Sequence, residues 1–114
     1  MIRGIGTDVA QISRFERALE RFGDRFERTA PRARAGHIAK RFAAKEAFSK
    51  AIGTGIHAPF VWHSIAVGRD PRGKPVLVPR EDMAAHLASM GVTHSHVSLT
   101  DDAGVAVAFV VLEG

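Results

Sequence analysis

The chain of 114 residues has the length of one domain, and its 46% hydrophobic and 25% charged residues are typical of a globular protein, which excludes the disordered and fibrous classes. The absence of cysteine excludes a disulfide framework and a zinc site with thiolate ligands. The formal net charge of +4 is unevenly distributed, +6 on the first 50 residues and −2 on the rest, so an anionic partner would be drawn to the first half.

Membrane insertion and export are not expected from the sequence. No apolar run approaches the roughly 20 residues that are needed to span a bilayer. The chain begins with MIRGIGTD, which lacks the long apolar stretch of a signal peptide and includes an acidic residue. We therefore expect a cytoplasmic protein without a membrane partner.

The predicted elements follow two hydrophobic periods. Apolar residues three and four positions apart predict helices, whereas alternation and short apolar runs between turn residues predict strands. In chain order we predict a strand at 2–9, a helix from the capping box at 13–16, a loop at 29–36, a helix at 37–52, strands at 61–67 and 76–78, a helix at 81–90, and strands at 94–100 and 105–112. This order predicts an α+β fold in a single domain, 1–114, with a mostly antiparallel sheet packed with helices.

The first predicted helix carries a regular row of arginines. Their spacing of three and four residues places them on one helix face if the helix or a following turn continues. The row consists of Arg14, Arg17, Arg21, Arg25 and Arg28. It can bind an acidic partner, and it can equally be a solvated face with acidic i,i+4 partners. The residues alone leave both interpretations open.

One face of the predicted helix at 37–52 combines groups of different chemistry. At 100° per residue, a carboxylate, a hydroxyl, an ammonium group and a glycine share a narrow sector with Phe42. These residues are Glu46, Ser49, Lys50 and Gly53. Because a solvated face seldom needs a glycine and a phenylalanine, we interpret this face as a candidate site.

Asp8, at the end of the first predicted strand, is a second carboxylate that can join Glu46. Two carboxylates brought together repel unless a cation joins them, and Mg²⁺ binds through one or two carboxylates together with water and phosphate oxygens. The alternative is that Asp8 caps a turn and Glu46 pairs with Lys50 at i,i+4. The common helix spacing by itself favours this alternative.

Three other features carry weaker signals. The glycine-rich loop at 53–55 offers backbone N–H groups to a phosphate, but it follows a helix and matches no nucleotide-binding fingerprint. His94 and His96 share one face of a strand without an evident third metal ligand, so we expect them to be exposed or structural. We expect Trp62 in the core.

Four segments of the chain resemble one known family. They are MIRGIGTD at 1–8, RFAAKEAFSKAIGTGI at 41–56, GKP at 73–75 and HVSLT at 96–100. Together they resemble the bacterial holo-[acyl-carrier-protein] synthases, a family of 4′-phosphopantetheinyl transferases, over nearly the whole chain. The segment at 41–56 is highly specific, whereas GKP alone would mean little.

The resemblance implies transfer of the phosphopantetheine arm of coenzyme A to a serine of apo acyl carrier protein, with release of adenosine 3′,5′-bisphosphate, for fatty acid biosynthesis. It implies that Asp8 and Glu46 hold Mg²⁺. This interpretation replaces the alternative in which Glu46 forms an i,i+4 ion pair with Lys50. Glu46 and Lys50 are the implied catalytic residues, Lys50 by neutralising the pyrophosphate and Glu46 by accepting the serine proton directly or through a water. The residues implied to line the coenzyme A site are Arg41, Ser49, Lys50, Gly53 and Pro75.

The resemblance further implies a trimer-forming, 4′-phosphopantetheinyl transferase-like fold with sites between neighbouring subunits. A shared site agrees with a chain that is too small to enclose a large ligand. The first helix is implied to dock the acidic carrier protein, which gives the arginine row a use. The implied docking residues are Arg14, Arg17, Arg21 and Arg25, with Arg14 first among them.

Two departures from the family pattern affect the expected site. Asp101 stands where the family usually has a histidine, and an ionised acid cannot donate a hydrogen bond to a phosphate. The segment at 29–36 is shorter than in the family and lacks its acidic residue. The alternative function is a noncatalytic basic module for an acidic protein or nucleic acid, and the resemblance leaves nucleic acid a distant second.

Overall fold

The computed structural model describes residues 1–22 and 31–114, with the backbone alone at 22 and 31–33. The elements are β1 (Ile2–Gln11), α1 (Ile12–Phe22), α2 (Pro31–Ala51), β2 (Ile65–Arg69), β3 (Pro75–Pro79), α3 (Glu81–Ser89), β4 (His94–Asp102) and β5 (Val105–Glu113). The order is the predicted one, and the three strand pairings are all antiparallel. The prediction of an α+β fold with an antiparallel sheet is therefore confirmed.

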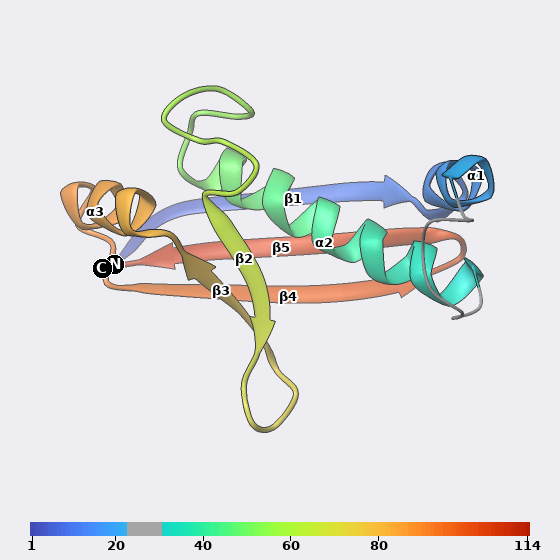
Figure 1. The fold of residues 1–114 in the computed structure, drawn as a ribbon. Coiled ribbons are helices and arrows are strands. Elements are labelled where there is room, and N and C mark those ends of the chain that lie inside the picture. The colour runs from blue at the N-terminus through green and yellow to red at the C-terminus, as the bar shows by residue number, and fades with distance from the viewer. Residues whose placement is uncertain (23–30) are drawn as a thin grey trace.

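The centre of the fold is a three-stranded sheet in the order β1-β5-β4, with α2 lying along one face of it (Figure 1). Alternate residues of β5 point into this layer and are completely buried, namely Ala106, Ala108, Val110 and Leu112. The facing side of α2 consists largely of alanines that are also completely buried, namely Ala39, Ala43, Ala44 and Ala47. Small side chains on both elements allow the helix to pack closely on the sheet.

The opposite face of this sheet remains open in the single chain. It exposes large apolar side chains of β1 and β5, including Ile5, Val9 and Phe109, which are 58%, 61% and 46% exposed. The strand register places Ile5 beside Val111 and Val9 beside Val107, so the apolar residues form one continuous patch. We call Ile5, Val9, Val107, Phe109 and Val111 the open sheet face. Apolar patches of this kind usually mark an interaction site.

β2 and β3 form a separate two-stranded sheet that projects from the body of the molecule (Figure 1). Its turn is held by Asp70, whose Oδ1 accepts the backbone N–H groups of Arg72 and Lys74 at 2.9 Å each. Both chain termini lie at one end of the central sheet, next to α3 (Figure 1).

Several predicted boundaries differ from the structure, and three of the differences have a clear physical reason. β1 does not end at Asp8 but continues to Gln11, because β5 pairs with it over that whole length. α2 begins at Pro31, so 31–36 are helical rather than part of a loop; proline is favoured in the first turn of a helix. The strand predicted at 61–67 begins at Ile65, because a turn occupies 61–64.

α1 starts one residue earlier than the predicted capping box. Ile12 follows β1 directly and is already helical, so Ser13 lies inside the first turn. The backbone N–H of Ile12 donates to the Gly104 carbonyl in the β4–β5 turn at 2.9 Å, which joins the start of the helix to the sheet.

Trp62 is not a core residue. Its side chain is 37% exposed and lies in the turn before β2. The turn is closed by Ser64, whose Oγ accepts the N–H of Val61 at 2.8 Å. The alternating pattern that predicted a strand at this point therefore describes a turn, and Trp62 lies on its outer side.

Candidate functional site

The close contact of β1 with α2 positions the predicted carboxylates. A Cβ atom at Gly4 or Gly6 would overlap the carbonyl oxygen of Ala51 or Ala47 in α2. Only glycine allows the two backbones to approach so closely. Asp8 follows on the same face of β1, so its carboxylate lies against α2, and its side chain is only 15% exposed.

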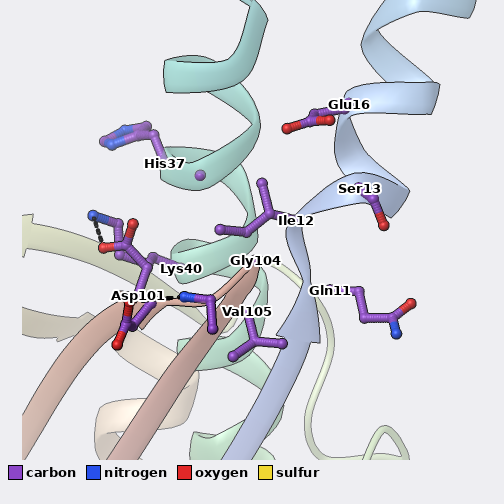
Figure 2. Close-up of a pocket in the computed structure, with 12 residues that line it drawn as sticks. Gln11, Ile12, Ser13, Glu16, His37, Lys40, Asp101, Gly104 and Val105 are labelled. Atoms are coloured by element: carbon purple, nitrogen blue, oxygen red, sulfur yellow. Dashed lines mark hydrogen bonds and ion pairs between the residues drawn. The ribbon is translucent and has the colours of Figure 1, made fainter.

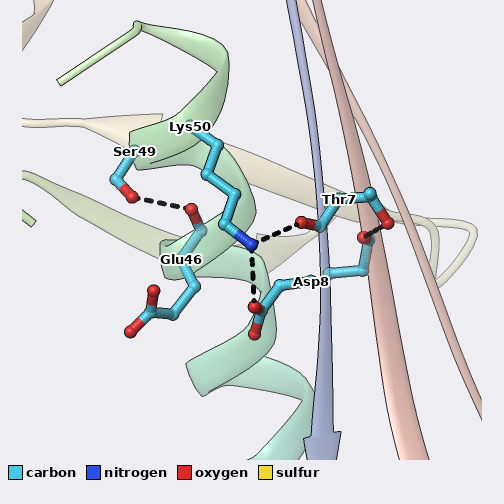
Figure 3. Close-up of polar contacts among 6 residues, drawn as sticks. Thr7, Asp8, Glu46, Ser49 and Lys50 are labelled. Carbon is cyan, nitrogen blue, oxygen red and sulfur yellow. Dashed lines mark hydrogen bonds and ion pairs between the residues drawn. The ribbon is translucent and has the colours of Figure 1, made fainter. Parts of the chain in front are cut away.

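Lys50 bridges the two elements at this contact (Figure 3). Its Nζ donates to Asp8 Oδ1 at 3.2 Å and to the Thr7 carbonyl at 3.1 Å. Glu46 lies one helical turn earlier, and its carboxylate is turned away from the ammonium group (Figure 3). Among the described residues, the ion pair of Lys50 is with Asp8 and not with Glu46. The i,i+4 ion pair between Glu46 and Lys50 within α2 is therefore not formed.

The donor set of Asp8 and Glu46 suits a magnesium ion. The Asp8 carboxylate is largely buried and already holds one cationic group, the ammonium of Lys50. Mg²⁺ typically uses one or two protein carboxylates and completes its shell with water and phosphate oxygens. No cluster of three or more histidine, aspartate and glutamate side chains suited to a metal occurs in 1–22 and 31–114, so a site made by protein ligands alone is not indicated there.

Ser49 and the loop at 53–55 make hydrogen bonds to the last carbonyl groups of α2. Ser49 is completely buried, and its Oγ donates to the Glu46 carbonyl at 2.7 Å. The N–H of Gly53, which has φ of 84°, donates to the Lys50 carbonyl at 3.0 Å. The N–H groups of Thr54 and Gly55 donate to the Ser49 carbonyl at 3.2 and 3.1 Å. The suggestion that this loop offers free N–H groups to a phosphate is therefore wrong.

Arg41 and Pro75 lie apart from this group. Arg41 is exposed on α2, nine residues before Lys50, which corresponds to about 13 Å along the helix axis. It lines a cavity of about 290 Å³ together with three other basic residues, His37, Lys40 and Arg69. Pro75 begins β3 and pairs with Arg69 in the strand register. The predicted coenzyme-binding residues thus occupy two separate parts of one chain.

A larger cavity of about 850 Å³ lies where β1, α1, α2 and the β4–β5 turn meet (Figure 2). At its wall, Lys40 Nζ pairs with Asp101 Oδ1 at 3.3 Å. Asp101 therefore neutralises a lysine of α2 in this chain. Partial burial, together with the charges of Arg41, Lys40 and Arg69, holds the pKa of His37 below its usual 6.5, so neutral His37 is favoured there.

The arginine row lies on the exposed side of α1. Arg14, Arg17 and Arg21 are exposed, and Arg25 lies outside the described residues. The Arg14 guanidinium is 4.9 Å from the ring centroid of Phe42 and 5.5 Å from that of Phe15, which is within cation–π range. Arg14 is therefore held in place by α2, although it lies on α1.

Trp62, which the sequence analysis expected in the core, and Lys45 extend this surface. The Trp62 ring centroid lies 5.1 Å from that of Phe42. Lys45 Nζ lies 5.1 Å from the Trp62 ring centroid and donates to the Trp62 carbonyl at 2.6 Å. Burial and the nearby Arg41 lower the pKa of Lys45. We call Arg14, Phe15, Phe42, Lys45 and Trp62 the cation–aromatic surface. The sequence signal for it was the mixture of basic and aromatic residues at 41–45, together with Trp62.

The two strand histidines are exposed, as predicted. His96 Nε2 lies 3.0 Å from Glu113 Oε1, and this contact lowers the pKa of Glu113. His94 Nδ1 lies 3.0 Å from the Thr93 hydroxyl. In the part of the chain that is described, no helix has both the length and the apolar character that crossing a bilayer requires.

Comparison with known proteins gives one consistent result. A family model described as the 4′-phosphopantetheinyl transferase superfamily matches residues 4–110. A holo-[acyl-carrier-protein] synthase of Aromatoleum aromaticum is 47% identical, over 99% of this chain and 98% of the relative. The crystal structure of a holo-[acyl-carrier-protein] synthase from Neisseria meningitidis has a TM-score of 0.85 and 34% identity, and covers 100% of both chains. That of a synthase from Bacillus anthracis in complex with coenzyme A (3′,5′-ADP) has a TM-score of 0.74 and 33% identity, over 98% of this chain and 96% of the other.

Proposed function

The chain belongs to the 4′-phosphopantetheinyl transferase superfamily, and from this premise we propose that it transfers 4′-phosphopantetheine from coenzyme A to a serine of apo acyl carrier protein for fatty acid biosynthesis. The proposal rests on the full-length similarity to holo-[acyl-carrier-protein] synthases, and on the juxtaposition of Asp8, Lys50 and Glu46 where β1 meets α2. Residues 1–114 act as one transferase domain, in the cytoplasm.

The reaction exchanges one phosphorus–oxygen bond for another. The serine oxygen forms a bond to the phosphorus that carries pantetheine, and the bond from this phosphorus to the bridging oxygen breaks, which releases adenosine 3′,5′-bisphosphate. Such a step needs positioned charges more than covalent help from the protein. Lys50 neutralises the pyrophosphate and the charge that develops on the bridging oxygen as it departs with adenosine 3′,5′-bisphosphate, and Glu46 accepts the serine proton directly or through a water that it orients.

Asp8 and Glu46 would hold Mg²⁺. When bound, the ion supplies positive charge to the pyrophosphate oxygens. Arg41, Gly53 and Pro75 would contact coenzyme A, with Ser49 acting from inside α2 through its bond to the Glu46 carbonyl. Arg41 and Pro75 lie apart from Lys50 in one chain, so a complete site requires residues from two neighbouring copies.

A homotrimer provides such neighbours, and the open sheet face is the surface available for it. This face offers adjacent apolar side chains on β1 and β5, and no element of the described residues covers it. Burial of such a patch between copies removes apolar surface from water. We therefore propose that the active unit is a trimer with sites between its subunits.

The carrier protein would dock on α1. Arg14, Arg17 and Arg21 are exposed, and together with Arg25, which follows them in the sequence, they suit a small acidic partner. Phe42 and Trp62 add apolar contact area next to Arg14. This docking site would place the serine of the carrier near α2, where Glu46 and Lys50 lie.

The decisive experiment is to incubate the protein with coenzyme A, apo carrier protein and Mg²⁺ and to measure the mass of the carrier. We expect a gain equal to one phosphopantetheine group, and we expect a chelator to prevent it. No gain would overturn the function in favour of a noncatalytic basic module, and a gain that persists in chelator would overturn the role of the metal.

Glu46→Gln tests the role assigned to the helix carboxylate. We expect transfer to fall by about a thousandfold or more, in the range lost when a catalytic acid–base or electrostatic group is removed. The thermal unfolding curve should remain that of the parent, because Glu46 is only partly buried and has no ion pair among the described residues. Full activity of Glu46→Gln would exclude Glu46 as an essential metal ligand or base.

A further inference from the structure

Lys50 occupies a place at Asp8 that the proposed function also gives to a divalent cation. The ammonium donates both to the Asp8 carboxylate and to the neighbouring Thr7 carbonyl. These two contacts come from adjacent residues of β1, so they fix the lysine against the strand. In the proposed reaction the same ammonium must instead reach the pyrophosphate.

The two partners differ in how easily they can move. Asp8 is 15% exposed and lies on a strand that packs backbone against backbone on α2 at Gly4 and Gly6. A largely buried carboxylate is costly to leave without a compensating charge. Lys50 is 52% exposed at the end of a flexible four-carbon chain. The carboxylate therefore stays in place, and the ammonium is the group that can leave.

We infer that Lys50 is the resident counter-charge of Asp8, and that it moves to the pyrophosphate of coenzyme A when a divalent cation binds at Asp8. This inference rests on the proposed function, because coenzyme A and the cation are its ligands. Two positive charges cannot share one carboxylate without repulsion. Metal binding alone must displace Lys50, whereas coenzyme A provides the displaced ammonium with a new anionic partner.

Lys50 thereby couples the two binding events. The cation should bind more tightly when coenzyme A has drawn the ammonium away, and coenzyme A should bind more tightly when the cation has freed it. Thermodynamic linkage requires the two effects to be equal in size. The side chain also protects the enzyme from holding a divalent cation without its substrate.

Calorimetry with Mn²⁺ as the probe tests this coupling without measuring activity. Four proteins are compared, each with and without saturating coenzyme A: the parent, Lys50→Met, Lys50→Arg and Arg80→Met. Arg80→Met is the matched control. Arg80 is an exposed cation that pairs with Asp82 at 3.2 Å, so this substitution removes one positive charge from a similar ion pair elsewhere in the chain.

In the parent we expect coenzyme A to raise Mn²⁺ affinity by about tenfold, a typical coupling between two sites. Without coenzyme A, Lys50→Met should bind Mn²⁺ about tenfold more tightly than the parent, and coenzyme A should then raise its Mn²⁺ affinity by a smaller factor than in the parent. Lys50→Arg, which keeps the charge, and Arg80→Met should both resemble the parent. Unchanged or weaker Mn²⁺ binding by Lys50→Met would overturn the inference.

The parent protein by itself provides a second test if Lys50→Met does not fold, as judged by its thermal unfolding. A parent that transfers phosphopantetheine but binds Mn²⁺ equally well with and without coenzyme A would overturn the inference and leave the proposed function intact. A parent that transfers nothing would overturn the proposed function itself.

Discussion

Gly6 is the residue on which the geometry of the site depends most directly. A side chain at this position would run into the Ala47 carbonyl of α2 and would push the helix away from β1. Asp8 and Lys50 lie on these two elements and meet only because the backbones approach closely. The site therefore depends on the absence of a side chain two residues before Asp8.

Gly6→Ala should destabilise the protein by at least about 1–3 kcal/mol, because overpacking a filled contact forces backbone shifts. The measurement is urea unfolding followed by circular dichroism.

Gly36→Ala is the matched control. Gly36 lies in α2, and among the described residues no atom outside its chain neighbours and its own helix backbone lies within 4 Å of an added Cβ; alanine in a helix is favoured over glycine by about 0.5–1 kcal/mol. We expect this variant to be as stable as the parent or more so. Equal stability of Gly6→Ala and the parent would show that the close contact is not required.

At the scale of elements, α1 and α2 are joined through Arg14. Its guanidinium lies over the Phe42 ring, so a charge of one helix that we propose for docking is oriented by an aromatic residue of the other helix. Arg17 and Arg21 belong to the same exposed row but have no ring contact of this kind with the residues that the structure describes. Arg14 is therefore expected to be the best ordered of the three arginines.

Arg14→Glu should raise the KM for apo carrier protein by about tenfold or more, since reversing a charge at an interface between oppositely charged partners turns attraction into repulsion. The KM for coenzyme A should change less than twofold, on the order of a surface substitution. Steady-state kinetics with each substrate varied in turn measures both.

The control is Arg80→Glu, which reverses a charge at the start of α3, away from the arginine row. It should leave both KM values near those of the parent. An unchanged carrier KM in Arg14→Glu would contradict docking on α1. High salt should raise the KM for apo carrier protein more in the parent than in Arg14→Glu, because the variant already lacks the salt-sensitive attraction between Arg14 and the carrier.

The whole molecule is elongated, with extents of 43 × 25 × 25 Å and a radius of gyration of 14.7 Å, compared with about 13 Å for a compact chain of this length. One helical layer covers one side of the central sheet, and the other side is the open sheet face. This shape agrees with the proposed trimer, in which other copies would provide the second layer over the open sheet face.

Phe109→Glu should convert the proposed trimer to single chains. A carboxylate buried in an apolar interface without a partner costs several kcal/mol, whereas in the single chain this side chain is 46% exposed and the change is tolerated. Light scattering after gel filtration should give a mass of one chain of 12.3 kDa instead of three. Transfer should be lost together with the trimer.

Val78→Glu is the control for this prediction. Val78 is 52% exposed on β3, outside the open sheet face, so its substitution should leave the mass and the transfer rate unchanged. A Phe109→Glu protein that remains trimeric would contradict the assignment of the open sheet face as the subunit interface.

Local pattern was enough to predict the order of the eight elements and the antiparallel fold class. Hydrophobic periods and turn residues depend on near neighbours in the chain, and they identified every helix and strand. They did less well at boundaries. Gly36 suggested a loop where Pro31 in fact starts a helix, and β1 runs past Asp8 because of its partner strand, which no local signal reports.

The sequence by itself determined which chemistry is available: a carboxylate at 8, the mixed polar face of the helix around Glu46 and Lys50, and the arginine row. Only the tertiary structure decided which carboxylate pairs with which cation. Helix spacing favoured Glu46 as the partner of Lys50, yet the ammonium binds Asp8, 42 residues away in sequence. The reason is physical: periodicity is a property of neighbours, whereas an ion pair forms with the charge that long-range packing brings closest, and here two glycines let a strand lie directly on a helix.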